Sequence, residues 1–217
     1  MIKITNLCKR FDENVLFDKY NLESEDGEFV VLSGESGAGK TTLLNMIGGL
    51  EPVDSGSILA DDIEVTKRKN KLRYYRDVVG FLFQNFALVD KKTVRQNLKL
   101  VKKNSRNGMS IEDALKQVGL LDKLDTKVYK LSGGEQQRVA LARLMVKNCK
   151  LILADEPTGS LDVKNAEMVM NILKQINKEG KTVILVTHVE EYKSIGDRCI
   201  YIKESSKNTE SKKTSQT

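Results

Sequence analysis

The sequence contains no hydrophobic run that could cross a membrane, because its apolar segments are far shorter than the roughly 18 residues required. Its amino-terminal stretch, MIKITNLCKRF, also lacks the apolar core and the cleavage site of a signal peptide. Cysteine is scarce: Cys8, Cys149 and Cys199 are scattered, and no metal-ligand spacing links them. We therefore expect a cytosolic protein whose thiols are reduced.

Positive charge, in contrast, is in excess. Among 217 residues, 36 are Lys or Arg and 30 are Asp or Glu, which gives a net charge of +6. The basic residues cluster in two segments, 67–76 and 91–106. These segments could contact nucleic acid or an anionic membrane surface, or they could be solvated faces of helices and loops. The length suits one domain, with room for an inserted subdomain.

Three short apolar runs indicate a buried parallel sheet. FVVLSG (29–34), LILADE (151–156) and TVILVTH (182–188) are rich in Val, Ile or Leu and show no period-two alternation. Helical patterns flank each run, and the longest begins at residue 163 and ends at Gly180. Its apolar residues share one helical face: Ala166, Val169, Met170, Leu173 and Ile176. Strands that alternate with helices predict an α/β fold.

The other segments predict additions to this core. MIKITNL (1–7), SILADDIEV (57–65) and neighbouring segments are typical of shorter strands at its edge. Residues 85–130 have a polar, helical pattern and predict an inserted helical subdomain. Residues 205–217 contain no apolar residue and predict a disordered tail, so the folded domain is expected to span residues 1–204.

The stretch GESGAGKT (34–41) matches the phosphate-loop pattern G-x-x-x-x-G-K-[ST] and lies between an apolar strand and a helix. Its three glycines would let backbone N–H groups and the helix dipole converge on phosphates. Lys40 would reach the β- and γ-phosphates, and the Thr41 hydroxyl would bind Mg²⁺. The alternative is an ordinary glycine-rich turn. GTPases, kinases and motors share this loop, so other residues must decide among them.

Two carboxylates end the second apolar run, where ligands bind in parallel sheets. Asp155 would hold Mg²⁺ through a water molecule. Glu156 is not needed for the metal and could polarise an attacking water, which favours hydrolysis over transfer to another substrate. The alternative is a strand that ends in an acidic turn broken by Pro157.

Three further residues are candidates with ordinary alternatives. His188 is the only histidine and would face the γ-phosphate if its strand neighbours the phosphate loop; otherwise it is a partly buried polar residue. Gln84 could bind Mg²⁺ or orient water, although glutamine at a strand end is common. Phe11 could stack on adenine, or it could simply belong to the core.

A second glycine-rich stretch, LSGGEQQ (131–137), raises a different question. Ser132 and Glu135 have the spacing of a capping box before an amphipathic helix. A capping box does not explain Gly133 and Gly134, since glycine in a first helical turn costs about 1 kcal/mol relative to alanine. The serine hydroxyl, the nearby N–H groups and the helix dipole together predict a second anion site.

Taken together, residues 2 to about 203 closely resemble the ATP-binding subunits of ABC transporters. GESGAGKT resembles the Walker A loop, LILADE the Walker B motif, FQ the Q-loop, LSGGEQQ the signature, SLD the D-loop and His188 the switch histidine. Phe11 stands where the family has an adenine-stacking aromatic, usually tyrosine, and Val189 stands where many members are acidic. The resemblance implies a P-loop NTPase with a parallel-sheet core, an N-terminal antiparallel β subdomain and an inserted helical subdomain.

The resemblance also implies roles for single residues. Glu156, His188 and Gln84 would act in ATP hydrolysis. The Mg²⁺ ion would be held by Thr41, Gln84 and Asp155. The D-loop, at a dimer interface, would be Ser160, Leu161 and Asp162, although Asp162 could also cap a helix. ATP would be bound by Phe11, Gly34, Glu35, Ser36, Gly37, Ala38, Gly39, Lys40, Thr41, Thr42, Ser132, Gly133, Gly134 and Glu135.

The implied assembly answers why two glycine loops are present. Two chains would pack head to tail around two ATP molecules, and LSGGEQQ of one chain would cap the γ-phosphate held by the other. Transport would then need separate integral membrane permease subunits, which places the chain at the cytoplasmic face of the cell membrane. The permease would dock near residues 86–89, which could equally be core of the helical lobe.

The stretches NMIGGLEPVDSGSI and FLFQNFALVDKKTVRQNLKL are most similar to the MacB/LolD-type branch, and within it to ATPases of lactococcin-type bacteriocin exporters. This implies export of a peptide or bacteriocin, a lipid-linked compound or a hydrophobic compound. One alternative is a regulatory ATPase that signals through membrane subunits without transport. A DNA-acting ABC ATPase usually carries a long coiled coil between the two glycine loops. Here only about 90 residues without sustained heptads separate these loops. A DNA-acting protein is therefore disfavoured, and no nucleic acid partner is expected.

Overall fold

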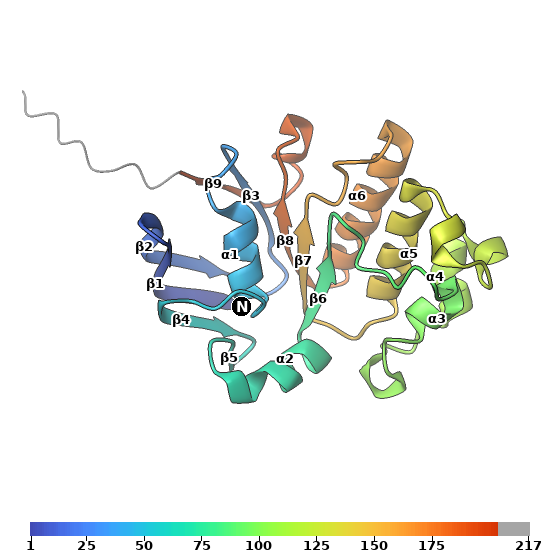
Figure 1. Ribbon diagram of the computed structural model, residues 1–217, viewed down its shortest axis with the longest axis horizontal. Helices are drawn as coiled ribbons and strands as arrows, with labels where there is room; N and C mark the ends of the chain where they lie inside the picture. Colours follow the sequence, from blue (N-terminus) through green and yellow to red (C-terminus); the bar gives the residue numbers. More distant parts are fainter. Residues whose placement is uncertain (204–217) are drawn as a thin grey trace, which may run out of the picture.

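The computed structural model describes residues 1–203, and a parallel β-sheet lies at their centre. In this described part, five strands follow the order β6 (Val79–Leu82), β7 (Leu151–Asp155), β8 (Thr182–Val186), β3 (Phe29–Gly34) and β9 (Arg198–Ile202) (Figure 1). The three apolar runs of the sequence are β7, β8 and β3, which are the interior strands. Interior strands are covered on both faces and therefore lose polar alternation. The predicted α/β fold is confirmed.

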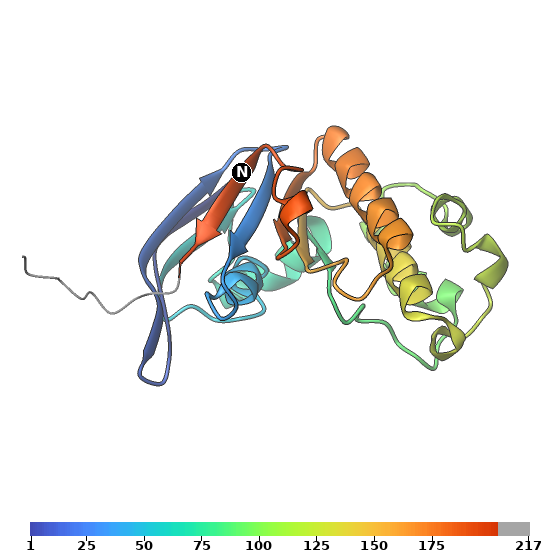
Figure 2. The same ribbon diagram turned by 90° about the horizontal axis from the view of Figure 1, so that it is seen from above.

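Hydrophobic clusters cover both faces of the parallel sheet. Alternate side chains of β3 point to opposite faces, so Val31 joins one cluster and Val30 joins the other. Helices α5 (Gly133–Met145) and α6 (Val163–Lys178) pack on the first face. Helix α1 (Lys40–Ile47) packs on the second (Figures 1 and 2).

Helix α6 forms where its apolar pattern predicts it. The Asp162 carboxylate accepts a hydrogen bond from the backbone N–H of Asn165 at 2.9 Å and caps the first turn. Gly180 lies just beyond the end of the helix with φ +90°. The buried residues of the helix are the five predicted ones: Ala166, Val169, Met170, Leu173 and Ile176.

The N-terminal strands form a separate antiparallel sheet. Its order is β2 (Asn14–Ser24), β1 (Ile2–Phe11), β4 (Ser55–Ala60) and β5 (Ile63–Glu64). The prediction of shorter edge strands was wrong, since β1 and β2 have 10 and 11 residues. Register shifts along β1 interrupt its alternation and hide its length in the sequence. The antiparallel subdomain implied by the resemblance is confirmed, and α1 shares a hydrophobic cluster with it.

Short helices connected by loops follow in the rest of the described chain. After β5 the chain passes through η1 (Arg68–Asn70) and α2 (Lys71–Asp77) into β6. A helical lobe beside α5 then contains α3 (Val94–Leu98), η2 (Lys103–Ser105), α4 (Ile111–Gln117), η3 (Leu121–Lys123) and η4 (Val128–Lys130). After β8 comes η5 (Glu190–Tyr192). The tail predicted over 205–217 lies outside the described residues.

Two ion pairs of one arginine join the parts of the helical lobe. Arg95 on α3 contacts Glu112 on α4 at 2.8 Å and Asp125 at 3.1 Å. Boundaries at residues 85 and 130 are still our proposal for the extent of this subdomain.

The parallel sheet decides where chemistry can occur. Strands β3, β7 and β8 are neighbours, and their carboxyl ends meet at one edge. The phosphate loop, the acidic pair and the histidine each follow one of these ends. The condition set for His188, that its strand neighbours the phosphate loop, is met by the β3–β8 pairing.

Candidate active site

The phosphate loop turns sharply between β3 and α1. Gly34 has φ +146°, and a Cβ there would lie 2.2 Å from the carbonyl oxygen of Ile202. Gly39, with φ +91°, is the N-cap residue of α1, and no side chain caps this helix start. Both positions therefore require glycine, and the first N–H groups of α1 are left for an anion.

Lys40 is held inside this loop. Its side chain is largely buried, and its ammonium donates to the carbonyl oxygens of Gly34 at 2.9 Å and Glu35 at 2.6 Å. A positive charge is thus fixed where the loop curves, beside the open N-terminus of α1. The two features reinforce each other as a site for phosphate.

A hydroxyl and a carboxylate meet next to the loop. Thr41 Oγ1 donates to Asp155 Oδ1 at 3.0 Å. Burial raises the pKa of Asp155 and the charge of Glu156 raises it further, while the Thr41 hydrogen bond and the Lys40 charge lower it. The net pKa is above the ordinary value, because burial outweighs the bond and the lysine. A cation bound here would offset the free-energy cost of the buried negative charge on Asp155.

The second carboxylate faces the histidine. His188 Nδ1 lies 3.1 Å from Glu156 Oε2, and the imidazole is largely exposed. Pairing of β7 with β8 produces this contact, and the Glu156 N–H donates to the carbonyl oxygen of Val186 at 3.0 Å. Glu156 has φ +42°, a left-handed conformation that is uncommon for glutamate and is typical of constrained functional positions.

A groove of about 570 Å³ brings ten of the predicted residues together. Its predicted lining residues are Phe11, Gly34, Ser36, Gly37, Gly39, Lys40, Thr41, Thr42, Glu156 and His188. Glu35 contributes its carbonyl oxygen to Lys40, and Ala38 is buried beneath the loop. Asn14 and Leu16 also line the groove, although sequence reasoning missed them because no motif marks the β1–β2 hairpin.

Gln84 lies in an adjoining cavity rather than in this groove. That cavity, of about 580 Å³, is also lined by Asp155 and Ser160. The Gln84 amide therefore shares an open space with the predicted metal-binding carboxylate. Asn45 and Asn85 line the same cavity and were not predicted, since asparagine in these segments gives no signal in the sequence.

The signature stretch does not line the groove of its own chain. Ser132 Oγ accepts from the N–H of Glu135 at 3.3 Å, and the Glu135 carboxylate accepts from the Ser132 N–H at 2.8 Å, so the capping box is confirmed. Ser132 and Gly133 are exposed. A Cβ on Gly134 would lie 3.2 Å from the amide nitrogen of Asn165, which gives that glycine an internal reason as well.

The D-loop lies at the Gln84 cavity and is linked to helix α5 through Asn165. Ser160 is exposed at the Gln84 cavity, and Leu161 packs against the core. Hydrogen bonds from Asn165 hold the pKa of Asp162 below its ordinary value. Asn165 also accepts a hydrogen bond from Arg138 on α5. Helix capping by Asp162, one of the two readings of the sequence, is confirmed.

The arrangement of these motifs matches a known family. Residues 17–159 match the model of the family described as ABC transporter. This chain belongs to the ABC transporter family. The ATP-binding/permease protein MacB of Campylobacter jejuni, described as a macrolide exporter, is 42% identical over 94% of this chain and 33% of its own length. The chain thus spans about one third of that relative.

Two other relatives are covered over most of their length. PhnC of Lactobacillus johnsonii, described as a phosphonates import ATP-binding protein, is 42% identical over 94% of this chain and 87% of its own length. MJ0796, an ABC transporter cassette from Methanocaldococcus jannaschii, has been solved as a dimer. That structure is 38% identical, covers 94% of both chains and superposes with a TM-score of 0.85.

A second dimeric structure of MJ0796 represents a post-hydrolysis state with ADP and phosphate, with a TM-score of 0.82 and 35% identity. As a member of the family, the chain is an ATPase that uses ATP with Mg²⁺. No helix within residues 1–203 combines the length and apolar character needed to span a bilayer.

The side chains of this chain fit that metal. Mg²⁺ prefers oxygen ligands and keeps several from water and phosphate, and Thr41 and Asp155 offer a hydroxyl and a carboxylate side by side. No three His, Cys, Asp or Glu side chains form a closed metal cluster in the described part of the chain. An open site of this kind suits an ion shared with a nucleotide. When bound, Mg²⁺ neutralises phosphate charge.

Proposed function

We propose that this chain is the ATP-hydrolysing subunit of an ABC exporter and closes as a head-to-tail homodimer around two ATP molecules. The observation that supports this most is the incomplete groove. Lys40 and Glu156 line it, whereas Ser132 and Gly133 belong to the exposed start of a capped helix elsewhere on the chain. A second copy could bring that helix start to the γ-phosphate. The dimeric MJ0796 structures support a homodimer.

The proposed chemistry divides among neighbouring side chains. Lys40 and the α1 N-terminus bind the β- and γ-phosphates, and Phe11 stacks on the adenine. Glu156 accepts a proton from the attacking water. The His188 imidazole contacts the Glu156 carboxylate through Oε2 and holds it in position. Loss of the γ-phosphate removes the contacts that join the copies, so the dimer opens. ATP thus supplies the differential affinity that a switch requires.

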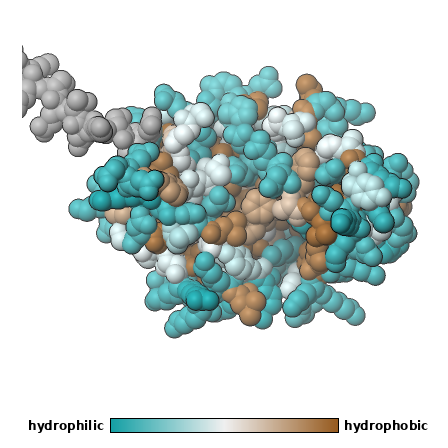
Figure 3. Space-filling model, viewed as in Figure 1, coloured by the Kyte–Doolittle hydropathy of each residue, from teal (hydrophilic) through white to brown (hydrophobic). Residues whose placement is uncertain are grey.

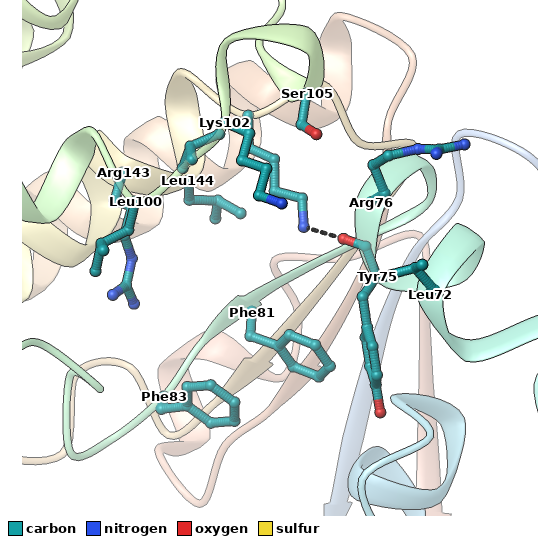
Figure 4. Close-up of a pocket in the computed structure, with 12 residues that line it drawn as sticks. Leu72, Tyr75, Arg76, Phe81, Phe83, Leu100, Lys102, Ser105, Arg143 and Leu144 are labelled. Atoms are coloured by element: carbon teal, nitrogen blue, oxygen red, sulfur yellow. Dashed lines mark hydrogen bonds between the residues drawn. The ribbon is translucent and has the colours of Figure 1, made fainter. Parts of the chain in front are cut away.

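A second groove provides the proposed docking site for a permease. This apolar groove, of about 400 Å³, lies between the sheet and the helical lobe (Figure 4). Its apolar lining includes Leu72, Tyr75, Phe81, Phe83 and Leu100. Figure 3, drawn from the same side as Figure 1, shows hydrophobic side chains gathered near the middle of the molecule. Phe86 and Leu88, from the segment expected to dock the permease, pack instead against the hydrophobic cluster of the helical side.

The charged side chains that line the apolar groove are all cationic. They are Arg76, Lys102, Arg143 and Lys147. Lys147 donates to the backbone oxygen of Tyr75 at 2.6 Å, and burial lowers the pKa of Lys147. We therefore propose that the occupant is a short amphipathic helix of an integral membrane permease, with apolar residues inward and carboxylates at its edge.

Two contacts join the apolar groove to the nucleotide side. Phe83 lines both this groove and the Gln84 cavity. Arg143 donates to the carbonyl oxygens of Ala87 at 2.6 Å and Phe86 at 3.1 Å, and both residues have positive φ. A helix seated in the groove would therefore act on a strained turn directly after Gln84.

For the cargo, we propose export of a peptide or bacteriocin, a lipid-linked compound or a hydrophobic compound, with the chain at the cytoplasmic face of the membrane. The name of the MacB relatives supports export, whereas the name of PhnC supports import. Residues 81–100 are similar to the same stretch of lactococcin-type exporters, and this similarity favours export over import. The lactococcin-type subgroup remains our proposal.

The variant Glu156→Gln tests the dimer. It should bind ATP normally, because the amide is isosteric, but hydrolyse it at least about 100-fold more slowly without its base. The mass measured by light scattering should be that of a dimer with ATP and Mg²⁺ and that of a monomer with ADP. A chain saturated with ATP that stays monomeric both alone and with its permease would contradict the proposal.

A further inference from the structure

A buried lysine contacts the ring of the proposed adenine platform. Lys9 and Phe11 are two residues apart on β1, and the Lys9 ammonium lies 4.7 Å from the centroid of the Phe11 ring. The side chain of Lys9 is only 6% exposed. The ring of Phe11, in contrast, is about half exposed and borders the phosphate-loop groove.

Three groups from the segment after α1 surround the ammonium. It pairs with Glu51 Oε1 at 2.5 Å, donates to the carbonyl oxygen of Pro52 at 2.9 Å and lies 3.8 Å from Asp54 Oδ1. The Asp54 carboxylate in turn accepts from the N–H of Arg10 at 2.7 Å. The segment after α1 is thereby tied to β1, and these contacts hold the Lys9 ammonium beside the ring.

A phenylalanine ring has no polar atom by which a hydrogen bond could orient it. Its position depends on packing, and here a cation occupies one face. A cation near the face of an aromatic ring is attracted to it, and more strongly when it is desolvated. Such a contact also draws π-electron density toward the occupied face, which leaves the other face better suited to a stacked, electron-rich purine.

We propose that Lys9 is a positioning residue for the nucleotide base: it holds the Phe11 ring and polarises it for stacking, and it does not contact the phosphates. This inference rests on the proposed function, in which Phe11 stacks on adenine. It predicts that Lys9 contributes to the binding of the base and contributes nothing to the binding of the triphosphate.

Comparison of two ligands isolates that contribution. Binding of ATP and of inorganic tripolyphosphate, each with Mg²⁺, should be measured calorimetrically. Lys9→Gln removes the charge but keeps an amide donor for Glu51 and Pro52. It should weaken ATP about 3- to 10-fold, because a ring that the cation no longer holds must be ordered when the base binds, and it should leave tripolyphosphate unchanged. Lys9→Arg should restore ATP to within about twofold, because the guanidinium is also a cation.

Two controls complete the design. Lys3→Gln removes another β1 lysine, which pairs with Glu23 at 2.5 Å and is half exposed, and it should change neither affinity. In the Phe11→Ala background, Lys9→Gln should have no further effect on ATP. Equal weakening of ATP and tripolyphosphate by Lys9→Gln, or an undiminished effect without the ring, would overturn the inference by assigning Lys9 a purely structural role.

Failure of the proposed function gives a different result. A wild-type chain that binds neither ligand would contradict the nucleotide site itself, and Phe11→Ala with unchanged ATP affinity would contradict the stacking platform. If Lys9→Gln does not fold, Lys9→Arg and Lys9→Met with the same two ligands decide. A folded Lys9→Met chain with wild-type ATP affinity would overturn the inference.

Discussion

Asp155 pairs a functional role with a cost to folding. Its carboxylate is partly buried beside a second carboxylate, and only Thr41 and Lys40 favour its charge. In the folded chain its pKa is raised above the value in the unfolded chain. The contribution of this group to stability is therefore present below the ordinary carboxyl pKa, near pH 4, and is lost as the pH rises through the folded pKa.

We predict that Asp155→Asn stabilises the nucleotide-free chain at neutral pH. The melting temperature should rise by about 1–3 °C at pH 7.5, which for a domain of this size is less than about 1 kcal/mol after allowance for solvent screening. The difference should shrink toward zero as the pH approaches about 4, where the wild-type carboxyl is protonated. Thermal unfolding at several pH values tests this, with Asp162→Asn as the matched control. A stability loss at neutral pH would contradict it.

Among the elements, α5 begins at a residue with two roles. Ser132 caps the helix through a confirmed capping box, and we also propose that it contacts the γ-phosphate of the second copy. The two roles respond differently to substitution. Aspartate is as good an N-cap as serine, but its negative charge would repel a phosphate.

We therefore predict opposite effects for two Ser132 variants. Ser132→Ala should lower the free energy of unfolding by about 1 kcal/mol through loss of the cap, while retaining some ATP-dependent dimer. Ser132→Asp should keep nearly wild-type stability and lose the dimer. Denaturant unfolding and light scattering in the Glu156→Gln background measure both properties. Equal dimerisation of Ser132→Asp and the parent would argue against a phosphate contact.

The strands and helices also differ in how well the sequence predicts them. Interior strands and α6 were predicted because burial on both faces, or on one helical stripe, leaves a periodic signal. The long strands β1 and β2 were not, because register shifts break their period. The phosphate loop, Asp155 and Glu156 carry local motifs. Lys9 and the apolar groove depend on contacts between distant segments, which no local pattern records.

At the scale of the whole molecule, the apolar groove and the Gln84 cavity meet at Phe83, the residue before Gln84. Because the apolar groove has a cationic rim, its partner should be recognised partly by charge. We predict that Lys102→Glu reduces co-purification of the permease at least about 10-fold, in the range of a lost interfacial charge pair. Lys3→Glu, on the far antiparallel sheet, should have no effect, and ATP affinity should report correct folding of both. Unchanged association of Lys102→Glu would rule out an acidic partner helix.

The central claim is that each ATP site is built from two chains, and a mixing experiment tests it most directly. Lys40→Met should inactivate the phosphate loop, and Ser132→Arg should inactivate the signature, so each variant alone should lack ATPase activity. In an equal mixture, half of the dimers combine both chains and hold one intact site. We expect about one quarter of the wild-type rate from independent sites in such symmetric dimers. A mixture as inactive as its components would contradict the account.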